Sequence, residues 1–335
     1  MSLPVVWFTI VAVFWTGFFV LEGFDFGVGS LHRFVGSNDL ERRVAINAIG
    51  PVWDGNEVWL IVAGASMFAA FPAWYATWFS ALYLALVLVL VALIIRGVSF
   101  EFRGKSESSR WRGTWSTTLT VGSVLAPLLI GVGLGDLLAG LPIDAQGSFT
   151  GSFVDLLTPF GLVFGATVLV LCLVHGATFL TLRTEGGVRD TAHRLARVLR
   201  WPAALLAIAA AAWTFALSGQ SLLSDALLVL VIAGALALWW YVGRHEVAAF
   251  AATAVTVGAT IASVFAGLYP RVLVSSTDPS ATLTVTGAAS GSYALTVMTW
   301  VAAVLFPVVL IYQGWTYRVF RARVTATPVL RRRST

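Results

Sequence analysis

The sequence predicts an all-α, polytopic integral membrane protein with nine transmembrane helices in a single membrane domain, residues 1–335. Hydrophobic residues make up 58% of the chain and charged residues only 11%, whereas a soluble domain carries roughly 25% charged residues. The apolar residues also fall in runs of about 20, the length that a helix needs to cross the hydrocarbon core of a bilayer. We expect the spans at 5–29, 50–70, 75–96, 115–137, 158–182, 200–218, 222–242, 247–268 and 293–317.

The first four spans begin and end at recognisable residues. No basic residue precedes the apolar run at the N-terminus, so we expect a retained span rather than a cleavable signal. The second span opens on Gly50-Pro51, and proline costs no hydrogen bond in the first turn of a helix. The third span ends at Arg96 and the fourth at Asp136, which we expect to be solvated at the outer surface.

The last five spans are apolar runs between polar loops. The fifth contains Cys172, the only cysteine, so no intrachain disulfide is possible. The sixth and seventh are separated only by Gly219-Gln220 and their neighbours. The eighth starts beside His245, and a loop rich in Ser, Thr and Gly (269–292) precedes the ninth. The loops are too short to bury a core of their own, so any function lies in the bilayer or involves a partner.

The basic residues alternate between the two sides of the predicted helices. Of the 21 Lys and Arg residues, 20 fall at one set of helix ends and only Arg271 falls at the other. Because cytoplasmic loops carry the excess of Lys and Arg, we expect the N-terminus outside and the C-terminus in the cytoplasm. This placement accounts for the net charge of +5 without nucleic acid as a partner, since no stacking platform interleaves the arginines. We expect the tail residues 331–333 to contact anionic headgroups of membrane lipid.

Two pairs of carboxylates lie inside predicted spans. Glu22 and Asp25 belong to the first span, and Asp54 and Glu57 belong to the second. Residues at i and i+3 share one face of a helix. Ionisable groups at membrane depth are costly, so they usually face the protein interior and serve ion or proton movement. Each pair is therefore a candidate functional site.

The predicted orientation places both pairs at a similar depth. The first span runs inward and the second outward, so all four acids lie in the cytoplasmic third, near Arg96 at the inner end of the third span. Acids in a mixture of buried and arginine-paired environments can take up and release protons. We therefore hypothesise a proton path from the cytoplasm, and the alternative that these acids only fix helix packing stays open. The candidate path residues are Asp54, Asp25, Glu57 and Glu22.

The histidines do not predict a haem or metal site within this chain. Membrane haem b is commonly held by His or Met side chains from facing helices. Only His175 lies well inside a span, His245 stands where a helix begins, and His32 and His193 fall in loops. We expect this chain alone to bind no metal, and we expect His175 to hydrogen-bond a neighbouring helix or subunit.

Several stretches resemble subunit II of the cytochrome bd ubiquinol/menaquinol oxidases. Most of them lie in the first hundred and the last fifty residues, and the run Trp53-Asp54-Gly55-Asn56 is the most specific of them. The chain length and the nine predicted spans agree with that family, while residues 185–260 carry no motif of it. The matching stretches are 22–29, 47–60, Arg96, 175–180 and 295–301.

The resemblance implies a fold of two four-helix bundles plus one extra helix, in a bacterial plasma membrane. It also implies a haem-bearing partner, subunit I, which would carry two b-type haems, one d-type haem and the quinol site. That complex would oxidise quinol and reduce dioxygen to water with protons from the cytoplasm, and this chain would not be active alone. In the family, the aspartate that matches Asp54 contributes to a proton path at the subunit interface. The supporting residues would be Trp53, Asn56, Arg96 and His175.

The sequence leaves several alternatives open. It does not decide whether a structural quinone binds this chain or whether a small accessory subunit is present. A proton-coupled secondary transporter and a purely structural assembly subunit are the other functions considered. Transporter folds usually show inverted repeats and helices broken at the midplane, whereas here the acids lie near one surface and the two halves share no obvious repeat.

Overall fold

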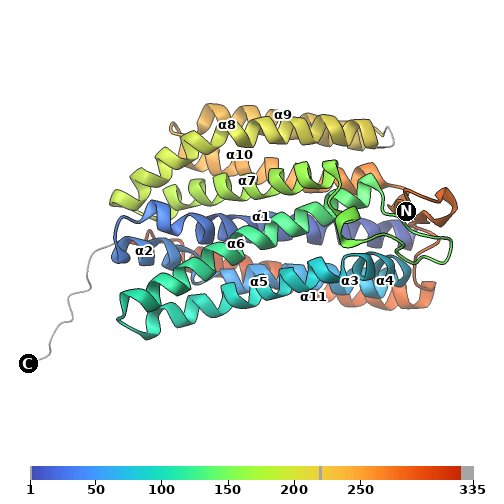
Figure 1. Cartoon of the computed structure of the whole chain (residues 1–335), viewed down its shortest axis with the longest axis horizontal. Coiled ribbons are helices and arrows are strands. Elements are labelled where there is room, and N and C mark those ends of the chain that lie inside the picture. The colour runs from blue at the N-terminus through green and yellow to red at the C-terminus, as the bar shows by residue number, and fades with distance from the viewer. Residues whose placement is uncertain (1, 219–220, 326–335) are drawn as a thin grey trace, which may run out of the picture.

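The helices run side by side in one elongated bundle (Figure 1). The computed structural model describes residues 2–218 and 221–325, so the predicted lipid contact at 331–333 lies outside the described residues. The helices of this part are α1 (Leu3–Val35), α2 (Asp39–Ile49), α3 (Trp53–Ala70), α4 (Pro72–Ala81), α5 (Tyr83–Phe102), α6 (Ser109–Ala139), α7 (Pro159–Arg183), α8 (Gly186–Leu217), α9 (Leu222–Tyr241), α10 (Glu246–Leu268) and α11 (Ser292–Val319). The short elements are the 3₁₀ turns η1 (Arg103–Lys105), η2 (Phe153–Leu156) and η3 (Pro279–Ala281) and the strands β1 (Arg271–Leu273) and β2 (Leu283–Thr284).

The all-helical membrane fold is confirmed, and most of the predicted spans are helices of the structure. Within the described ranges, 8 helices are long and apolar enough to cross a membrane. The second predicted span corresponds to α3, which has 18 residues and begins with polar side chains that lower its hydropathy. The count of nine spans, their grouping into two four-helix bundles plus one helix, and the membrane orientation stay predictions.

The third predicted span is wrong as a single helix. It consists of α4 and α5, which meet at Leu82, where φ is −87° and ψ is 12°. The amide of Leu82 still donates to the Trp78 carbonyl at 3.0 Å, and the Leu82 carbonyl accepts from Leu86 at 2.8 Å. The chain therefore bends without losing these backbone hydrogen bonds. Leu82 packs against Gly133 of α6. No proline or glycine stands at the bend itself, so the bend could not be predicted from the local sequence.

The loops on the predicted cytoplasmic side are more helical than expected. The segment between the first two spans contains α2, which Asn38 caps by accepting a hydrogen bond from the Glu41 amide at 3.0 Å. Hydrogen bonds from the Ser37 hydroxyl and amide in turn lower the pKa of the exposed Glu41 carboxyl. Helix α8 begins at Gly186 rather than at the predicted residue 200. Its first turns bury apolar residues at helical spacing, and the arginines between them masked this pattern. The buried residues are Val188, Ala192 and Ala196.

Helix α1 lies at the centre of the bundle and contacts α3, α6, α7 and α10. Its closest approach is to α7, where a methyl group on Gly27 would lie 2.0 Å from the Cys172 carbonyl oxygen. Gly176 of α7 meets the backbone of Gly27 in the same way. Small residues at such crossings let membrane helices approach closely. This contact fixes the depth of the acidic part of α1 relative to α7.

The loops at the N-terminal end of the bundle pack on one another (Figure 1). The Leu141 amide donates to the Val274 carbonyl at 2.9 Å, and the Ser276 amide donates to the Leu141 carbonyl at 2.9 Å. Strands β1 and β2 pair antiparallel in the second of these loops. Along the bundle, α8 and α9 form one long edge of the view, and α5 and α11 lie along the opposite edge.

Candidate functional site

Two carboxylates share one buried guanidinium where α1, α3 and α5 meet. Arg96 Nη2 lies 2.6 Å from Glu22 Oε1, and both side chains are fully buried. Arg96 Nη1 lies 3.5 Å from Glu57 Oε2, and the Glu57 side chain is 21% exposed. The structure therefore joins these three residues in one cluster, while their depth in the membrane stays a prediction.

Aromatic rings surround the guanidinium of this cluster. Arg96 Cζ lies 4.7 Å from the ring centroid of Phe26 and 5.3 Å from that of Phe100. The indole of Trp53 stacks on Phe100 with centroids 4.6 Å apart and lies 6.0 Å from Arg96 Cζ. A cation over an aromatic face is stabilised by the ring quadrupole. Trp53 therefore belongs to the wall of the ion-pair cluster.

Asp25 is the third buried acid, and it is held by an amide. Asn56 Nδ2 donates to Asp25 Oδ2 at 2.7 Å, and Asp25 is fully buried. Asn56 Oδ1 in turn accepts from Gln313 Nε2 at 3.1 Å and from the Tyr317 hydroxyl at 2.9 Å. The same amide side chain thus connects the acid of α1 to the last helix.

Gln313 and Tyr317 are residues of the site that the sequence reasoning missed. Gln313 Oε1 also accepts from Trp59 Nε1 at 3.0 Å, so polar contacts join α11 to α3 across an otherwise apolar interface. The one signal in the sequence is that a glutamine and a tyrosine stand four residues apart near the end of a long apolar run. That spacing places them on one face of the helix.

His175 crosslinks three helices next to this cluster. Its Nε2 lies 3.1 Å from the Val20 carbonyl of α1, and its Nδ1 lies 2.6 Å from the Thr253 hydroxyl of α10. A carbonyl only accepts hydrogen bonds, so Nε2 carries the proton. The Thr253 hydroxyl lies between His175 Nδ1 and the Phe250 carbonyl, which is 2.7 Å from it. The ring also stacks on Phe250 at 4.6 Å. Both nitrogens are engaged within the chain, which is the helix-to-helix contact expected of His175.

Asp54 does not join the buried cluster. Its side chain is exposed on α3, and its Oδ1 accepts a hydrogen bond from the next backbone amide, that of Gly55, at 2.9 Å. Glu57 stands one turn further along the same helix face. The four predicted path residues therefore separate into three that share the interior with Arg96 and one on the surface of the chain.

A groove lies beside Asp54, between α3 and α11. It has a volume of about 780 Å³ and a mostly apolar lining, which includes Trp59, Val301 and Phe306. Most of its polar members stand where α3 begins and α11 ends, and they include Asp54 and Gln313. The same face of the chain thus carries Asp54, the hydrogen bonds of Asn56 and Gln313, and the apolar groove.

The cluster holds more acids than cations. Glu22 and Glu57 share the guanidinium of Arg96, Asp25 is held beside them by the Asn56 amide, and burying an uncompensated charge is costly. A set of carboxyls with fewer cations than acids can keep a proton. Asn56 donates to Asp25 and accepts from the Tyr317 hydroxyl, which fixes the position of this acid.

The histidines of this chain do not fit a haem-ligand role. His175 uses both ring nitrogens, and His245 caps α10 by accepting from the Ala248 amide at 3.2 Å. His32 and His193 were expected in loops, which is wrong, because they lie on α1 and α8. His32 Nδ1 contacts the Gly29 carbonyl at 2.7 Å, and His193 Nε2 contacts Glu246 at 2.8 Å. In the described part of the chain, no group of three or more His, Cys, Asp or Glu side chains is arranged to hold a metal ion.

Asp136 was expected to be solvated, and the structure contradicts this expectation. It is fully buried, and its Oδ1 accepts from the Thr158 hydroxyl at 2.6 Å. Thr158 caps α7, and the glycine at 161 leaves room for the carboxylate, since a methyl group there would lie 2.3 Å from Asp136 Oδ1. The acid therefore joins the end of α6 to the start of α7. The sequence pattern did not show this because the cap lies on the next helix.

Comparison with known proteins gives one consistent result. The family model of cytochrome bd terminal oxidase subunit II matches residues 3–320. The chain is 42% identical over 330 residues to cytochrome bd ubiquinol oxidase subunit 2 of Bacillus subtilis, covering 97% of each chain. It is 36% identical over 364 residues to cytochrome bd-I ubiquinol oxidase subunit 2 of Escherichia coli, covering 97% of this chain and 96% of the relative. A bd oxidase structure from Geobacillus thermodenitrificans has the same fold, with a TM-score of 0.76, 18% identity, and coverage of 96% of this chain and 99% of that one.

Proposed function

Because the chain belongs to the cytochrome bd terminal oxidase subunit II family, we propose that it delivers cytoplasmic protons to the oxygen-reducing centre of its partner, subunit I. A respiratory quinol oxidase, which is an oxidoreductase, contains this subunit, and the family implies both a subunit I and haems in the complex. The apolar helices and the bacterial relatives indicate a multi-pass protein of the bacterial plasma membrane.

The observation that carries the proposal is the exposure of Asp54 on a helix at membrane depth. A carboxylate facing lipid is expensive, so such groups face a protein or a water-filled cavity. The neighbouring α11 is apolar and buries a single residue, Leu295, within the described chain. We therefore place subunit I on the α3 and α11 face, where it would cover Asp54. The acid would then lie at the interface between the two subunits.

The path would lead through the interior of the chain to this interface. Asp54 and Glu57 share a helix face, and Glu57 lies 3.5 Å from Arg96. Arg96 joins Glu57 to Glu22. In this scheme the interior acids store protons, Glu57 passes them to Asp54 at the boundary with the partner, and the guanidinium keeps the cluster from accumulating negative charge. The amide network beside Asp25 would orient the acid on the other side of Glu22.

The cofactors of the reaction would lie outside this chain. We assign haems b and d to subunit I, where they would carry electrons from quinol to dioxygen, because the histidines here are used in internal contacts. A structural quinone would fit the groove between α3 and α11, whose volume of about 780 Å³ lies in the usual range of small-molecule sites. Quinol and dioxygen would be substrates of the whole complex, and this chain alone would have no turnover.

The test is quinol-dependent oxygen consumption by the assembled complex. Asp54→Asn should lower turnover at least tenfold, since a positioned proton-transfer group contributes roughly a hundredfold or more. Asp54→Glu, which keeps a titratable group, should retain most of the activity. The matched control is Asp190→Asn, which removes an exposed carboxylate from α8 on the opposite edge of the bundle. Full turnover of a fully assembled Asp54→Asn complex would refute the proton role.

A second variant separates proton transfer from packing. Asp25→Asn should slow oxygen reduction while the complex keeps its haem spectrum, because asparagine preserves the shape of the side chain that Asn56 holds. Failure of the Asp25→Asn complex to assemble would instead support the packing alternative for the buried acids. The family assignment favours a proton-path subunit or a packing subunit of the oxidase over a proton-coupled transporter.

A further inference from the structure

A basic cleft lies on the cytoplasmic side predicted for the chain, between the start of α8 and the turn that joins α9 to α10. Its volume is about 420 Å³. The turn passes through Gly243, whose φ of +82° is the left-handed conformation that glycine adopts without strain. Four of the residues that line the cleft are Arg189, His193, Arg244 and His245.

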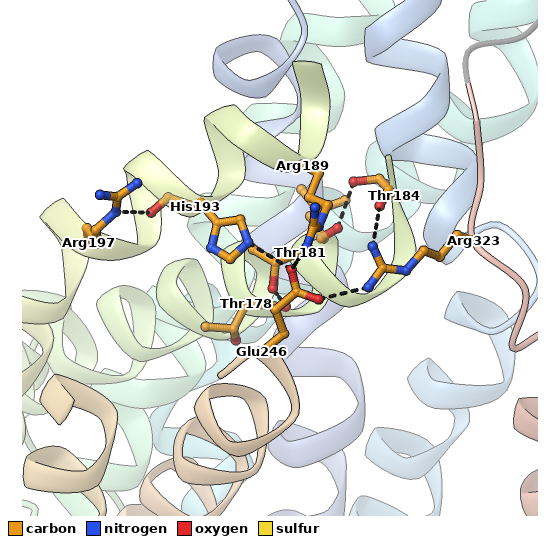
Figure 2. A network of polar contacts seen from close by, with 9 residues as sticks. Thr178, Thr181, Thr184, Arg189, His193, Arg197, Glu246 and Arg323 are labelled. Carbon is orange, nitrogen blue, oxygen red and sulfur yellow. Dashed lines mark hydrogen bonds and ion pairs between the residues drawn. The ribbon is translucent and has the colours of Figure 1, made fainter. Parts of the chain in front are cut away.

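One carboxylate organises the cations around the cleft (Figure 2). Glu246 Oε1 accepts from Arg189 Nε at 2.8 Å and contacts His193 Nε2 at 2.8 Å. Glu246 Oε2 accepts from Arg323 Nη2 at 2.8 Å, which ties the segment after α11 to α10. Figure 2 shows these side chains converging on Glu246 from two separate parts of the chain, α8 and the segment after α11. Charge-assisted hydrogen bonds of this kind fix the geometry of both partners. The cleft wall is therefore built in advance of any ligand.

The cations that line the cleft or lie at its edge outnumber this carboxylate, with Arg244 in the lining and Arg197 at the edge. Arg197 lies against the turn, since a methyl group on Gly243 would stand 3.2 Å from Arg197 Cδ. Arg244 Nη1 donates to the Trp240 carbonyl at 2.9 Å, and Arg197 Nε donates to the His193 carbonyl at 3.4 Å. Each guanidinium has five N–H donors, and both side chains are exposed. Arg197 and Arg244 thus keep positive charge and donors for a ligand from outside the chain.

The surroundings of the cleft are those of a membrane surface. Trp201, Trp239 and Trp240 are exposed on α8 and α9 just beyond it, and tryptophan concentrates at the headgroup level of bilayers. Arg244 Cζ lies 4.1 Å from the Trp240 ring. Arg200 Cζ lies 5.5 Å from both Trp201 and Trp239. Arg200 and Arg244 stack on these tryptophans, so their charges lie at the level expected for the phosphate groups of membrane lipid.

The position in the bundle points to lipid rather than to a protein subunit. Helices α8 and α9 form the edge of the molecule opposite α11 (Figure 1). A partner seated over Asp54 would leave this edge to the bilayer. From the charge, the free donors and the indole belt, we propose that the cleft binds the phosphate of an anionic phospholipid, with Arg197 and Arg244 as its principal contacts. Glu246 serves as the positioning residue that holds the neighbouring cations in place.

The proposal is tested by lipid retention in the assembled oxidase complex. The complex would be delipidated, exposed to nanodiscs of phosphatidylcholine containing phosphatidylglycerol, and analysed by native mass spectrometry for bound lipid. Each basic residue near a membrane surface contributes roughly fivefold to the binding of anionic lipid, so Arg197→Gln/Arg244→Gln should weaken phosphatidylglycerol binding roughly thirtyfold. The matched control is Arg43→Gln/Arg110→Gln, which removes two exposed cytoplasmic-side arginines away from the cleft and should leave retention unchanged.

The remaining outcomes decide the chemistry of the ligand. Gel filtration of the Arg197→Gln/Arg244→Gln complex should show intact assembly, because both side chains are exposed. Equal retention of phosphatidylglycerol by this variant and the unmodified complex would overturn the proposal. Displacement of the lipid by inorganic phosphate at similar affinity would overturn the assignment to a lipid and indicate a soluble phosphate ligand. Preference for phosphatidylcholine over phosphatidylglycerol would overturn the role of charge.

Discussion

Replacing Arg96 with methionine should destabilise the protein far more than the loss of an ordinary arginine. The guanidinium is fully buried, and its Nη2 lies 2.6 Å from the equally buried Glu22. Arg96→Met leaves that carboxylate in the interior with no counter-charge. Breaking a buried pair in this way costs about 3–5 kcal/mol, whereas an exposed pair contributes about 0–1 kcal/mol. Loss of the aromatic contacts with Phe26 and Phe100 adds about 0.5–2 kcal/mol.

A double-mutant cycle separates the charge from the packing. Glu22→Gln/Arg96→Met removes both charges and keeps side chains of similar size, so it should recover at least about 2 kcal/mol relative to the sum of the two single losses. Arg96→Lys should be intermediate, because it keeps the charge and loses the planar fork. The exposed Arg110→Met is the matched control.

The measurement is the free energy of unfolding of the purified complex in mixed detergent micelles, with SDS as denaturant and tryptophan fluorescence as the signal. Two results would refute the reasoning. The first is a loss below about 1 kcal/mol for Arg96→Met, the size typical of a solvent-exposed pair. The second is a double variant that is as unstable as the sum of its single variants, which would mean that Glu22 and Arg96 do not interact.

Three further substitutions test contacts that the structure alone reveals. Gly27→Ala should destabilise the complex by about 3 kcal/mol or more, because its methyl group would lie 2.0 Å from a carbonyl oxygen of α7. The control Gly113→Ala has open space around the new methyl group and should be tolerated. Equal thermal stability of the two variant complexes would contradict the close crossing of α1 and α7. Asn56→Ala should lower the free energy of unfolding by about 1–3 kcal/mol, because it leaves buried polar groups unpaired. It should also make α11 more accessible to limited proteolysis. An unchanged cleavage rate would show that the Asn56 amide does not hold this helix. Thr158→Val should lower the free energy of unfolding by about 1–3 kcal/mol, because Asp136 loses its hydrogen-bond donor. Thr158→Ser keeps a hydroxyl and should have the unfolding midpoint of the unmodified complex. A Thr158→Ser complex as unstable as Thr158→Val would exclude the hydroxyl as the cause.

The membrane fold could be predicted because it depends on local composition. Apolar runs of sufficient length must be helical in lipid, where each backbone polar group needs an internal partner. For the same reason the run 247–268 was placed within a residue of α10. The prediction failed where tertiary contacts act, as at Leu82, whose bend depends on α6, and in residues 186–199, where helical burial occurs among arginines.

The candidate site was predicted in part. The spacing of Glu22, Asp25 and Glu57 and the position of Arg96 at the end of a span placed all four at one depth, because helix rise and span direction fix depth along the membrane normal. The spacing could not show that Asp54 faces outward while Glu57 reaches the guanidinium. The rotation of α3 about its axis decides that difference, and packing against α1 and α5 sets the rotation.

The sequence by itself determined that the chain spans a membrane, which residues carry charge within it, and to which family the chain is related. Only the tertiary structure decided which of these charges meet, that α11 is joined to α3 through Asn56 and Gln313, and that the carboxylate of Asp136 is buried. The physical reason is that hydropathy and helical period act along one chain segment. Contacts between segments depend on how each helix is rotated, bent and crossed by its neighbours, and close glycine crossings such as that at Gly27 set those variables.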